Sequence, residues 1–330
     1  MVDIKYFFLK WREQAIKAIA VAATIALAGC TTTGPEAAGI KTSQKELLQP
    51  WINLTGARAG APTALPGIVG GTGYVVLRQP AAISARNNDL YLLDTGLRRI
   101  FRYSRIEQTL TPFTGMTAEA GMNIYVAADM SVYITDPARV RVLHFSGNGT
   151  PLPSLNSPGD LGRPVSIAAD EGSGEILVAD ALYDQIVRFN NLGRPLSIIK
   201  PQQVRGIAAI ALGSDGIYVL DRIARQVVVI GRDGSYRYAF GAGTLASPQA
   251  IAVDRGNMVF VSDQFDQTVK IYRGRQLVGS VGGSGAAPGC FNDIAGLTVD
   301  GGLLYIADSL NANVQIMFIN PQALSNRKGE

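Results

Sequence analysis

The sequence predicts an all-β protein, a β-propeller of six blades, and three observations lead to it. Short apolar runs rich in β-branched and aromatic residues, as expected of strands, alternate with turn residues along most of the chain. One pattern of such runs occurs six times, at intervals of 41 to 45 residues. A period of about 42 residues with three or four strands per unit is typical of a propeller blade, which must stack on neighbours to bury both of its faces.

An aspartate ends the second strand of each copy and gives the alignment. An aliphatic residue follows it by six positions and a large apolar residue by nine. The six aspartates are Asp94, Asp136, Asp180, Asp221, Asp263 and Asp308. Each comes just before a turn, where a carboxylate accepts N–H groups of its own loop. We therefore interpret the six as turn residues, one per blade, and not as metal ligands.

The first strand of each copy is predicted to line the central channel. These strands are small and apolar, and none contains an ionisable group: 83–85, 126–128, 167–169, 208–210, 251–253 and 297–299. Such a lining suits a narrow axis and argues against a catalytic channel. The last copy lacks a fourth strand, because only the polar residues 320–330 follow its third. We expect a segment before the first copy, 68–71 or 74–77, to close the last blade.

The N-terminal segment predicts a cellular location. A basic start leads to a twelve-residue apolar run over 18–29, which is too short to span a bilayer and is typical of a secretory signal. The run ends Leu27-Ala28-Gly29-Cys30, which resembles the lipobox of bacterial lipoproteins. That resemblance implies acylation of Cys30, palmitate included, and anchoring in a membrane. The alternative is an ordinary cleaved signal or a short anchor with a chance cysteine. Thr31 at the next position implies the outer membrane, facing the periplasm.

The expected domains follow from these segments. They are a signal peptide over 1–29, a lipidated N-terminus and flexible linker over 30–66, one propeller over 67–320, and a polar tail over 321–330. Within the linker, Trp51 is expected to anchor on the domain surface. A single closed ring is expected to be monomeric.

The charge of the chain excludes one class of partner. The net charge is +4, and the first 29 residues contain four basic and two acidic side chains, which leaves about +2 for the rest. A domain so close to neutral has no general attraction for nucleic acid.

The repeated motif resembles the NHL repeat. In the sixth copy Gly289-Cys290-Phe291-Asn292 is followed by Leu297-Thr298-Val299-Asp300 and Leu304-Tyr305-Ile306-Ala307-Asp308, and residues 248–272 match as well. The resemblance covers roughly 68–319 and implies six blades with a binding face built from loops. Copies one and four depart from it, with Arg86 and Leu212 where the first strand usually ends in Asp. Cytoplasmic NHL propellers bind RNA on that face, which an exported protein does not routinely meet.

No catalytic or cofactor motif stands out, and we expect no cofactor and no metal. The single histidine, His144, is predicted to lie out on a blade, and a zinc site needs three or four ligands. If Cys30 carries lipid, Cys290 stands alone without a disulfide, as a small buried hydrophobe.

The loops after the second strands and those that enter the first strands share one face, where arginines recur. They are Arg98, Arg99, Arg139, Arg141, Arg163, Arg205, Arg222 and Arg225. The guanidinium group suits carboxylates and phosphates, so these residues are candidate partner-binding groups. The alternative is that they are scattered solvated charges. Tyr183 and Phe265 lie in the same loops as candidate exposed anchors.

Two functions remain open. The first is an envelope lipoprotein, a non-catalytic binding or scaffolding propeller for a periplasmic or outer-membrane protein or glycan. The second is a metal-dependent enzyme that resembles lactonases or lyases, against which the channel lining argues.

Overall fold

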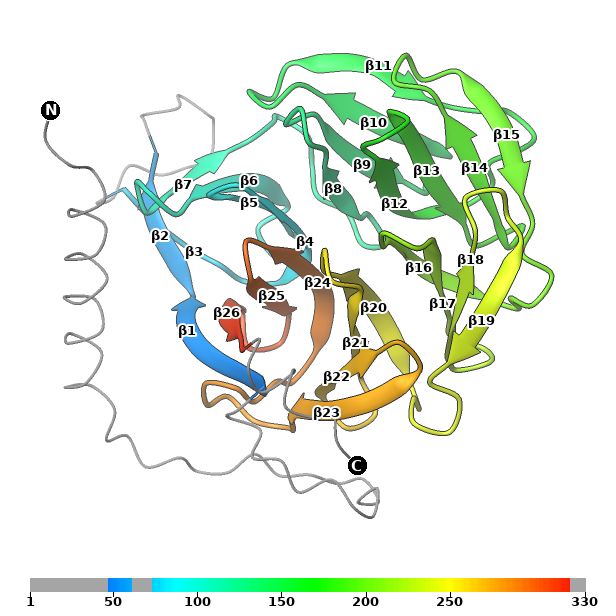
Figure 1. Cartoon of the computed structure of the whole chain (residues 1–330). Helices are drawn as coiled ribbons and strands as arrows, with labels where there is room; N and C mark the ends of the chain where they lie inside the picture. Colours follow the sequence, from blue (N-terminus) through cyan, green and yellow to red (C-terminus); the bar gives the residue numbers. More distant parts are fainter. Residues whose placement is uncertain (1–46, 61–72, 321–330) are drawn as a thin grey trace, which may run out of the picture.

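Six β-sheets surround a central axis in the computed structural model, which describes residues 47–60 and 73–320 (Figure 1). They confirm the predicted six-bladed propeller. Blade 1 contains β4 (Pro80–Arg86), β5 (Asp89–Asp94), β6 (Arg99–Ser104) and β7 (Thr109–Pro112), from the axis outward. Blade 2 contains β8 (Ile124–Val126), β9 (Val132–Asp136), β10 (Arg141–Phe145) and β11 (Pro151–Leu155).

The other blades repeat this order. Blade 3 contains β12 (Pro164–Asp170), β13 (Glu175–Asp180), β14 (Gln185–Phe189) and β15 (Pro195–Ile199). Blade 4 contains β16 (Ile207–Leu212), β17 (Ile217–Asp221), β18 (Gln226–Ile230) and β19 (Tyr236–Phe240). Blade 5 contains β20 (Pro248–Val253), β21 (Met258–Asp263), β22 (Thr268–Arg273) and β23 (Gln276–Gly282). Blade 6 contains β24 (Ile294–Asp300), β25 (Leu303–Asp308) and β26 (Asn313–Ile319), with β1 (Leu48–Leu54) as its outer strand.

An N-terminal strand closes the ring, as predicted, but its identity differs from the prediction. β1 pairs antiparallel with β26, with Leu48 opposite Ile319 and Leu54 opposite Val314. The expected segment 74–77 instead contributes β3 (Tyr74–Val76), while 68–71 lies outside the described residues. β1 contains Pro50 and a register shift before Ile52. Its sequence therefore lacks the regular alternation by which a strand is recognised.

Blade 1 is extended by a hairpin. β2 (Gly56–Ala59) lies parallel to β7 and antiparallel to β3, which gives a sheet of six strands. Residues 48–59 therefore belong to the propeller, and the expected boundary at residue 67 is wrong for them.

Apolar side chains fill the spaces between blades rather than one central core. Six buried clusters are present among the described residues, and each combines side chains of two neighbouring blades. Large aromatic groups such as Tyr91, Tyr218 and Phe260 on the second strands are almost fully buried there. Burial of apolar surface at each boundary is what makes one repeat depend on the next.

Hydroxyl groups join neighbouring first strands around the axis. Ser84 Oγ on β4 accepts from the Val126 N–H on β8 at 3.0 Å, and Ser166 Oγ on β12 accepts from the Ile210 N–H on β16 at 3.1 Å. Thr298 Oγ1 on β24 accepts from the Ala85 N–H at 3.4 Å. These channel hydroxyls therefore link neighbouring blades.

Candidate functional site

The propeller has two faces, which we name by their connections. The loop face holds the loops that enter the first strands and the loops that follow the second strands. The turn face holds the turns that join first to second and third to fourth strands. Both ends of the folded part lie at the turn face, because Leu48 pairs with the end of β26 and the Asn320 N–H donates to the Leu47 carbonyl at 3.0 Å.

The six aspartates are fully buried and organise the loop face. Asp180 shows the common arrangement: its carboxylate accepts from the N–H groups of Gly162 and Arg163, in the loop that enters β12, at 2.6 Å each. It also accepts from Leu182 at 2.9 Å and Tyr183 at 3.0 Å, in its own loop. The prediction that these aspartates are turn residues is confirmed. Sequence reasoning missed that most of them also bind the entering loop of the same blade.

Blade 2 departs from this arrangement. Its entering loop is held by Thr135, whose Oγ1 accepts from the Asn123 N–H at 2.7 Å. Asp136 instead contacts two of the candidate arginines, Arg139 Nη1 and Arg141 Nε, each at 3.2 Å. Arg139 also reaches Glu119 at 3.5 Å. Arg139 and Arg141 therefore compensate a buried carboxylate, which limits their use as partner-binding groups.

Most of the remaining candidate arginines on the loop face form no ion pair within the described residues. Arg98, Arg163, Arg205, Arg222 and Arg225 are exposed, and none forms an ion pair within the described residues. Arg99 is half-buried and has a partner. The arginines do not form one continuous arc. Four of the unpaired ones belong to blades 3 and 4, and Arg98 stands apart in blade 1.

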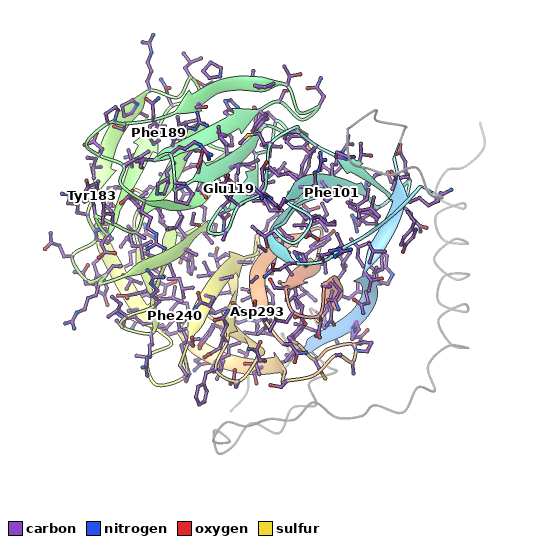
Figure 2. The ribbon with its side chains drawn as sticks, turned by 180° about the vertical axis from the view of Figure 1, so that it is seen from behind. Phe101, Glu119, Tyr183, Phe189, Phe240 and Asp293 are labelled. Carbon is purple, nitrogen blue, oxygen red and sulfur yellow. The ribbon has the colours of Figure 1, made fainter. Side chains whose placement is uncertain are left out.

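A set of apolar side chains occupies one turn position in four consecutive blades. The residue two positions after the buried aspartate is Leu182, Ile223, Phe265 and Leu310 in blades 3 to 6, with exposed fractions of 60%, 62%, 60% and 70%. We call these four residues the apolar arc. Blades 1 and 2 carry Gly96 and Ala138 at this position. Tyr183, beside the arc, is 47% exposed and lies at the rim in Figure 2, whereas Asp293 lies nearer the axis.

The arc was missed by sequence reasoning, apart from Phe265 and the neighbouring Tyr183, which are exposed as predicted. The sequence contains the pattern that could have identified the arc, because aligning the copies on the aspartates places the four apolar residues at the same position. Their exposure was not available from the sequence. Leu182 and Ile223 lie over Gly162 and Gly206, where even a methyl group would clash with them.

The central channel has a volume of about 1160 Å³ and is lined by the six first strands and their turns. The first strands contribute mostly small apolar side chains to its wall, as predicted for five of them, and their turns contribute polar and charged groups such as Arg86 and Asp254. The prediction for blade 2 is shifted, because β8 covers 124–126 and places Tyr125 against the channel. Burial raises the pKa of Tyr125, so its hydroxyl is protonated at neutral pH and is no base.

Charged side chains gather where the channel opens on the turn face, a feature that the sequence reasoning did not predict. Arg86 pairs with Glu171, which joins blades 1 and 3, and Arg232 of blade 4 pairs with Asp170. Burial alone would raise the pKa of Asp170, but hydrogen bonds from Arg232 and the Gly172 N–H lower it below its usual range. These four side chains form two ion pairs at the channel opening, and each pair connects two blades.

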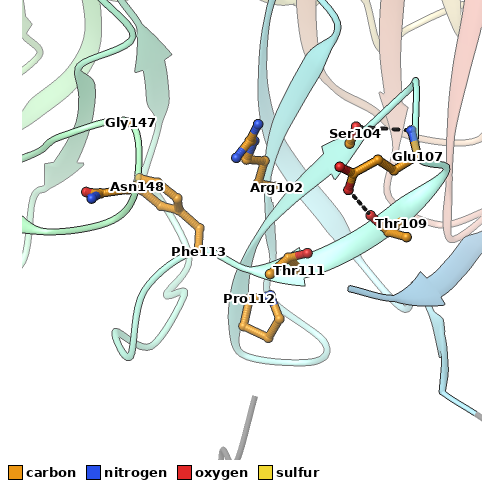
Figure 3. A pocket seen from close by; sticks show the side chains of 9 residues that line it. All are labelled: Arg102, Ser104, Glu107, Thr109, Thr111, Pro112, Phe113, Gly147 and Asn148. Atoms are coloured by element: carbon orange, nitrogen blue, oxygen red, sulfur yellow. Dashed lines mark hydrogen bonds between the residues drawn. The ribbon is translucent and has the colours of Figure 1, made fainter. Parts of the chain in front are cut away.

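A second, much smaller pocket of about 100 Å³ lies between the outer parts of blades 1 and 2 (Figure 3). Arg102, Glu107 and Asn148 are among its lining residues. Ligand pockets usually measure about 300 to 1,000 Å³, so this pocket is too small for a typical substrate.

No metal set is present among the described residues, since no group of three or more His, Cys, Asp or Glu side chains is placed to hold an ion. His144 lies on β10, as predicted, and stacks on Tyr133 with ring centroids 4.3 Å apart, away from the channel. Its Nε2 has no hydrogen-bond partner, and burial lowers the pKa of the imidazole.

Cys290 differs from the prediction in one respect. It is 3% exposed, as expected of a buried residue, but it is not a free cysteine. The chain contains one other cysteine, Cys30, which lies outside the described residues. Within 47–60 and 73–320, no helix is long and apolar enough to cross a bilayer.

Comparison with known proteins finds likenesses of fold only. No family model and no curated protein matches the chain. A Bacteroides thetaiotaomicron protein of unknown function is similar over 82% of this chain and 75% of its own, with 16% identity and a TM-score of 0.61. A streptogramin B lyase matches 84% of this chain and 100% of its own at 12% identity, with a TM-score of 0.59. A gluconolactonase from Xanthomonas campestris matches 80% and 97% at 13% identity, also with a TM-score of 0.59.

Proposed function

We propose that this chain is an NHL-like propeller of the cell envelope, anchored through lipid on Cys30 and acting as a non-catalytic binding module through its loop face. Its partner would be a protein, glycan or other component of the periplasm or outer membrane. Support for the anchor comes from the apolar run and the lipobox-like sequence that ends at Cys30. Support for the binding role comes from the loop face itself.

The apolar arc is the observation that carries this proposal. Four large apolar side chains at equivalent positions are mostly exposed to solvent. Covering such apolar surface with a partner would lower the free energy. Their backbones are fixed, since the N–H groups of Leu182, Ile223 and Phe265 donate to buried aspartates at 2.9, 3.0 and 3.1 Å. A partner that covers them therefore meets a surface that is already ordered, so little conformational entropy is lost on binding.

A crosslinked pull-down from the native envelope tests the binding role. The full lipoprotein is compared with a variant in which Arg163, Arg205 and Arg222 are all changed to Glu. In a control variant, three exposed arginines outside the loop face are changed to Glu instead: Arg194, Arg237 and Arg275. We expect a partner that the parent and the control capture and the loop-face variant loses. Equal capture by all three would refute the loop face as the site.

An enzyme that resembles lactonases or lyases is the second candidate. The channel of about 1160 Å³ is large enough for a substrate, and the similar structures include a lyase and a gluconolactonase. One of them is described as a catalytically inactive histidine-to-alanine variant of virginiamycin B lyase with quinupristin. The one histidine of the present chain lies outside the channel. Elemental analysis of the purified protein separates the two functions, since stoichiometric bound metal would favour the enzyme.

A further inference from the structure

The approximate symmetry of the ring is expected to place the four residues of the apolar arc near one plane. Each sits at the same position after a buried aspartate, and the blades that carry them are related by rotation about the channel axis. Rotation about an axis keeps height and radius constant, so equivalent side chains reach equally far from the loop face. A planar set of separate apolar groups is complementary to a flat surface. A protein partner does not require coplanarity, whereas a bilayer does.

The charges around the apolar arc have one sign. In the loops of blades 3 to 6, the exposed charged side chains are all basic: Arg163, Lys200, Arg205, Arg222 and Arg225. The acidic groups in these loops are half-buried and already hydrogen-bonded. Asp293 accepts from Gln264 at 2.7 Å, Asp184 accepts from the Ile207 N–H at 2.9 Å, and Asp266 lies 3.1 Å from Lys270 Nζ. The exposed charged side chains on this side of the molecule are therefore all basic, and they lie beside the exposed apolar arc.

We infer that the loop face of blades 3 to 6 docks on an anionic lipid surface, with the apolar arc inserted among the acyl chains and the arginines at the headgroups. This inference rests on the proposed function and names the partner of the same site. Interfacial apolar groups combined with cations are the usual means by which a folded domain lies on a membrane.

The length of chain before β1 permits this orientation. Leu48 lies at the turn face, and seventeen residues separate it from Cys30. Seventeen residues span at most about 60 Å. The seven residues of β24 rise about 24 Å along the strand, which sets the scale of the distance between the faces. The chain between the lipid and β1 is thus long enough for the opposite face to lie on the same bilayer.

Two tryptophan variants in one blade test this orientation. Leu182, on the loop face of blade 3, is 60% exposed, and Leu192, in the turn on the other face of that blade, is 69% exposed. Leu182→Trp and Leu192→Trp are made in the full lipoprotein and reconstituted into vesicles of phosphatidylcholine with phosphatidylglycerol. Brominated phosphatidylcholine quenches a tryptophan that enters the acyl region. The parent protein is subtracted to remove the signal of Trp51.

We expect quenching and a blue shift for Leu182→Trp, and neither for Leu192→Trp. Quenching should fall about tenfold when phosphatidylglycerol is omitted or when Phe265 and Leu310 are both changed to Ser. No quenching at either position, or quenching at Leu192→Trp alone, overturns the lipid inference. The pull-down with Arg-to-Glu variants is independent of this result. A protein or glycan captured at the loop face without quenching would leave the proposed function intact and exclude the lipid surface.

Discussion

The Nζ atom of Lys270 lies 2.8 Å from Oδ2 of Asp263, and the two side chains are 10% and 0% exposed. Lys270 also donates to the Thr244 carbonyl at 2.7 Å, in the loop that enters β20. Among the six equivalent aspartates, only Asp263 and Asp136 form an ion pair within the described residues. The other four depend on N–H donors. The buried aspartate is thus stabilised by N–H donors alone in four blades and also by a cation in the other two. Unfolding free energies can measure this difference.

Lys270→Met should destabilise the protein by about 3 kcal/mol, because it leaves a buried carboxylate without its cation. Burial raises the pKa of Asp263, but the hydrogen bonds from Lys270 and the Ala246 N–H outweigh it and hold the pKa below its usual range. A lowered pKa contributes stability above the unfolded value of about 4, and this is lost as the pH falls. Urea unfolding should therefore show a smaller acid-induced loss in Lys270→Met than in the parent. A Lys200→Met control, at an exposed lysine, should change neither quantity.

Asp308 should respond in the opposite direction. Its burial raises the pKa above the usual range, against the hydrogen bonds from Asp293 and Asn311 that lower it. A raised pKa means that the contribution to stability is full below the unfolded value and is lost as the pH rises through the folded value. We therefore expect Asp308→Asn to cost about 1 to 2 kcal/mol at neutral pH, less than Asp263→Asn, which strands a buried lysine. Unfolding free energies at several pH values check this, and a cost that grows with pH would contradict it.

The residue four positions after each buried aspartate has a left-handed backbone, and none of the six is glycine. The φ angles lie between 48° and 55° for Arg98, Val140, Asp184, Arg225, Gln267 and Ala312. The conformation costs an ordinary residue about 1 kcal/mol, and a β-branched one is the least suited to it. Val140→Gly should therefore raise the unfolding free energy by about 1 kcal/mol, since Val140 lies in a loop and is 39% exposed. Thermal unfolding measures this, and Ala312→Gly should gain less. A loss of stability in Val140→Gly would show that its side chain has a packing role.

The sequence allowed the blades to be predicted because one residue, the turn aspartate, recurs with fixed neighbours. The six aspartates set the register of second and third strands, and the continuous apolar runs that precede them predict second strands buried on both faces. The closing strand was not predictable in this way. Its pairing with β26 is formed across the whole chain, and neither Pro50 nor Trp51 follows an alternating pattern.

The candidate site was predictable only in part, for a similar reason. The arginine positions identified the correct face, but which guanidinium groups are unpaired depends on side-chain distances. Arg139 and Arg141 were indistinguishable in sequence from Arg222 and Arg225, although Asp136 pairs with the first two. The charges at the channel mouth were missed because Arg86 and Asp170 end their strands and only meet partners from other blades in the folded ring.

The N-terminal anchor can be tested at Cys30 with Cys290 as the comparison, because these are the two cysteines of the chain. An acylated Cys30 at the mature N-terminus would place the lipid thioether on its sulfur, and that sulfur could not then form a disulfide with Cys290. Cys30→Ala should therefore lose the acyl mass and the membrane fraction, whereas Cys290→Ser should keep both. Mass spectrometry of the mature protein and fractionation of the envelope check this. If the parent shows no acyl mass and instead a reducible link between Cys30 and Cys290, the lipid anchor is refuted, and the disulfide would tie the N-terminal segment to blade 6.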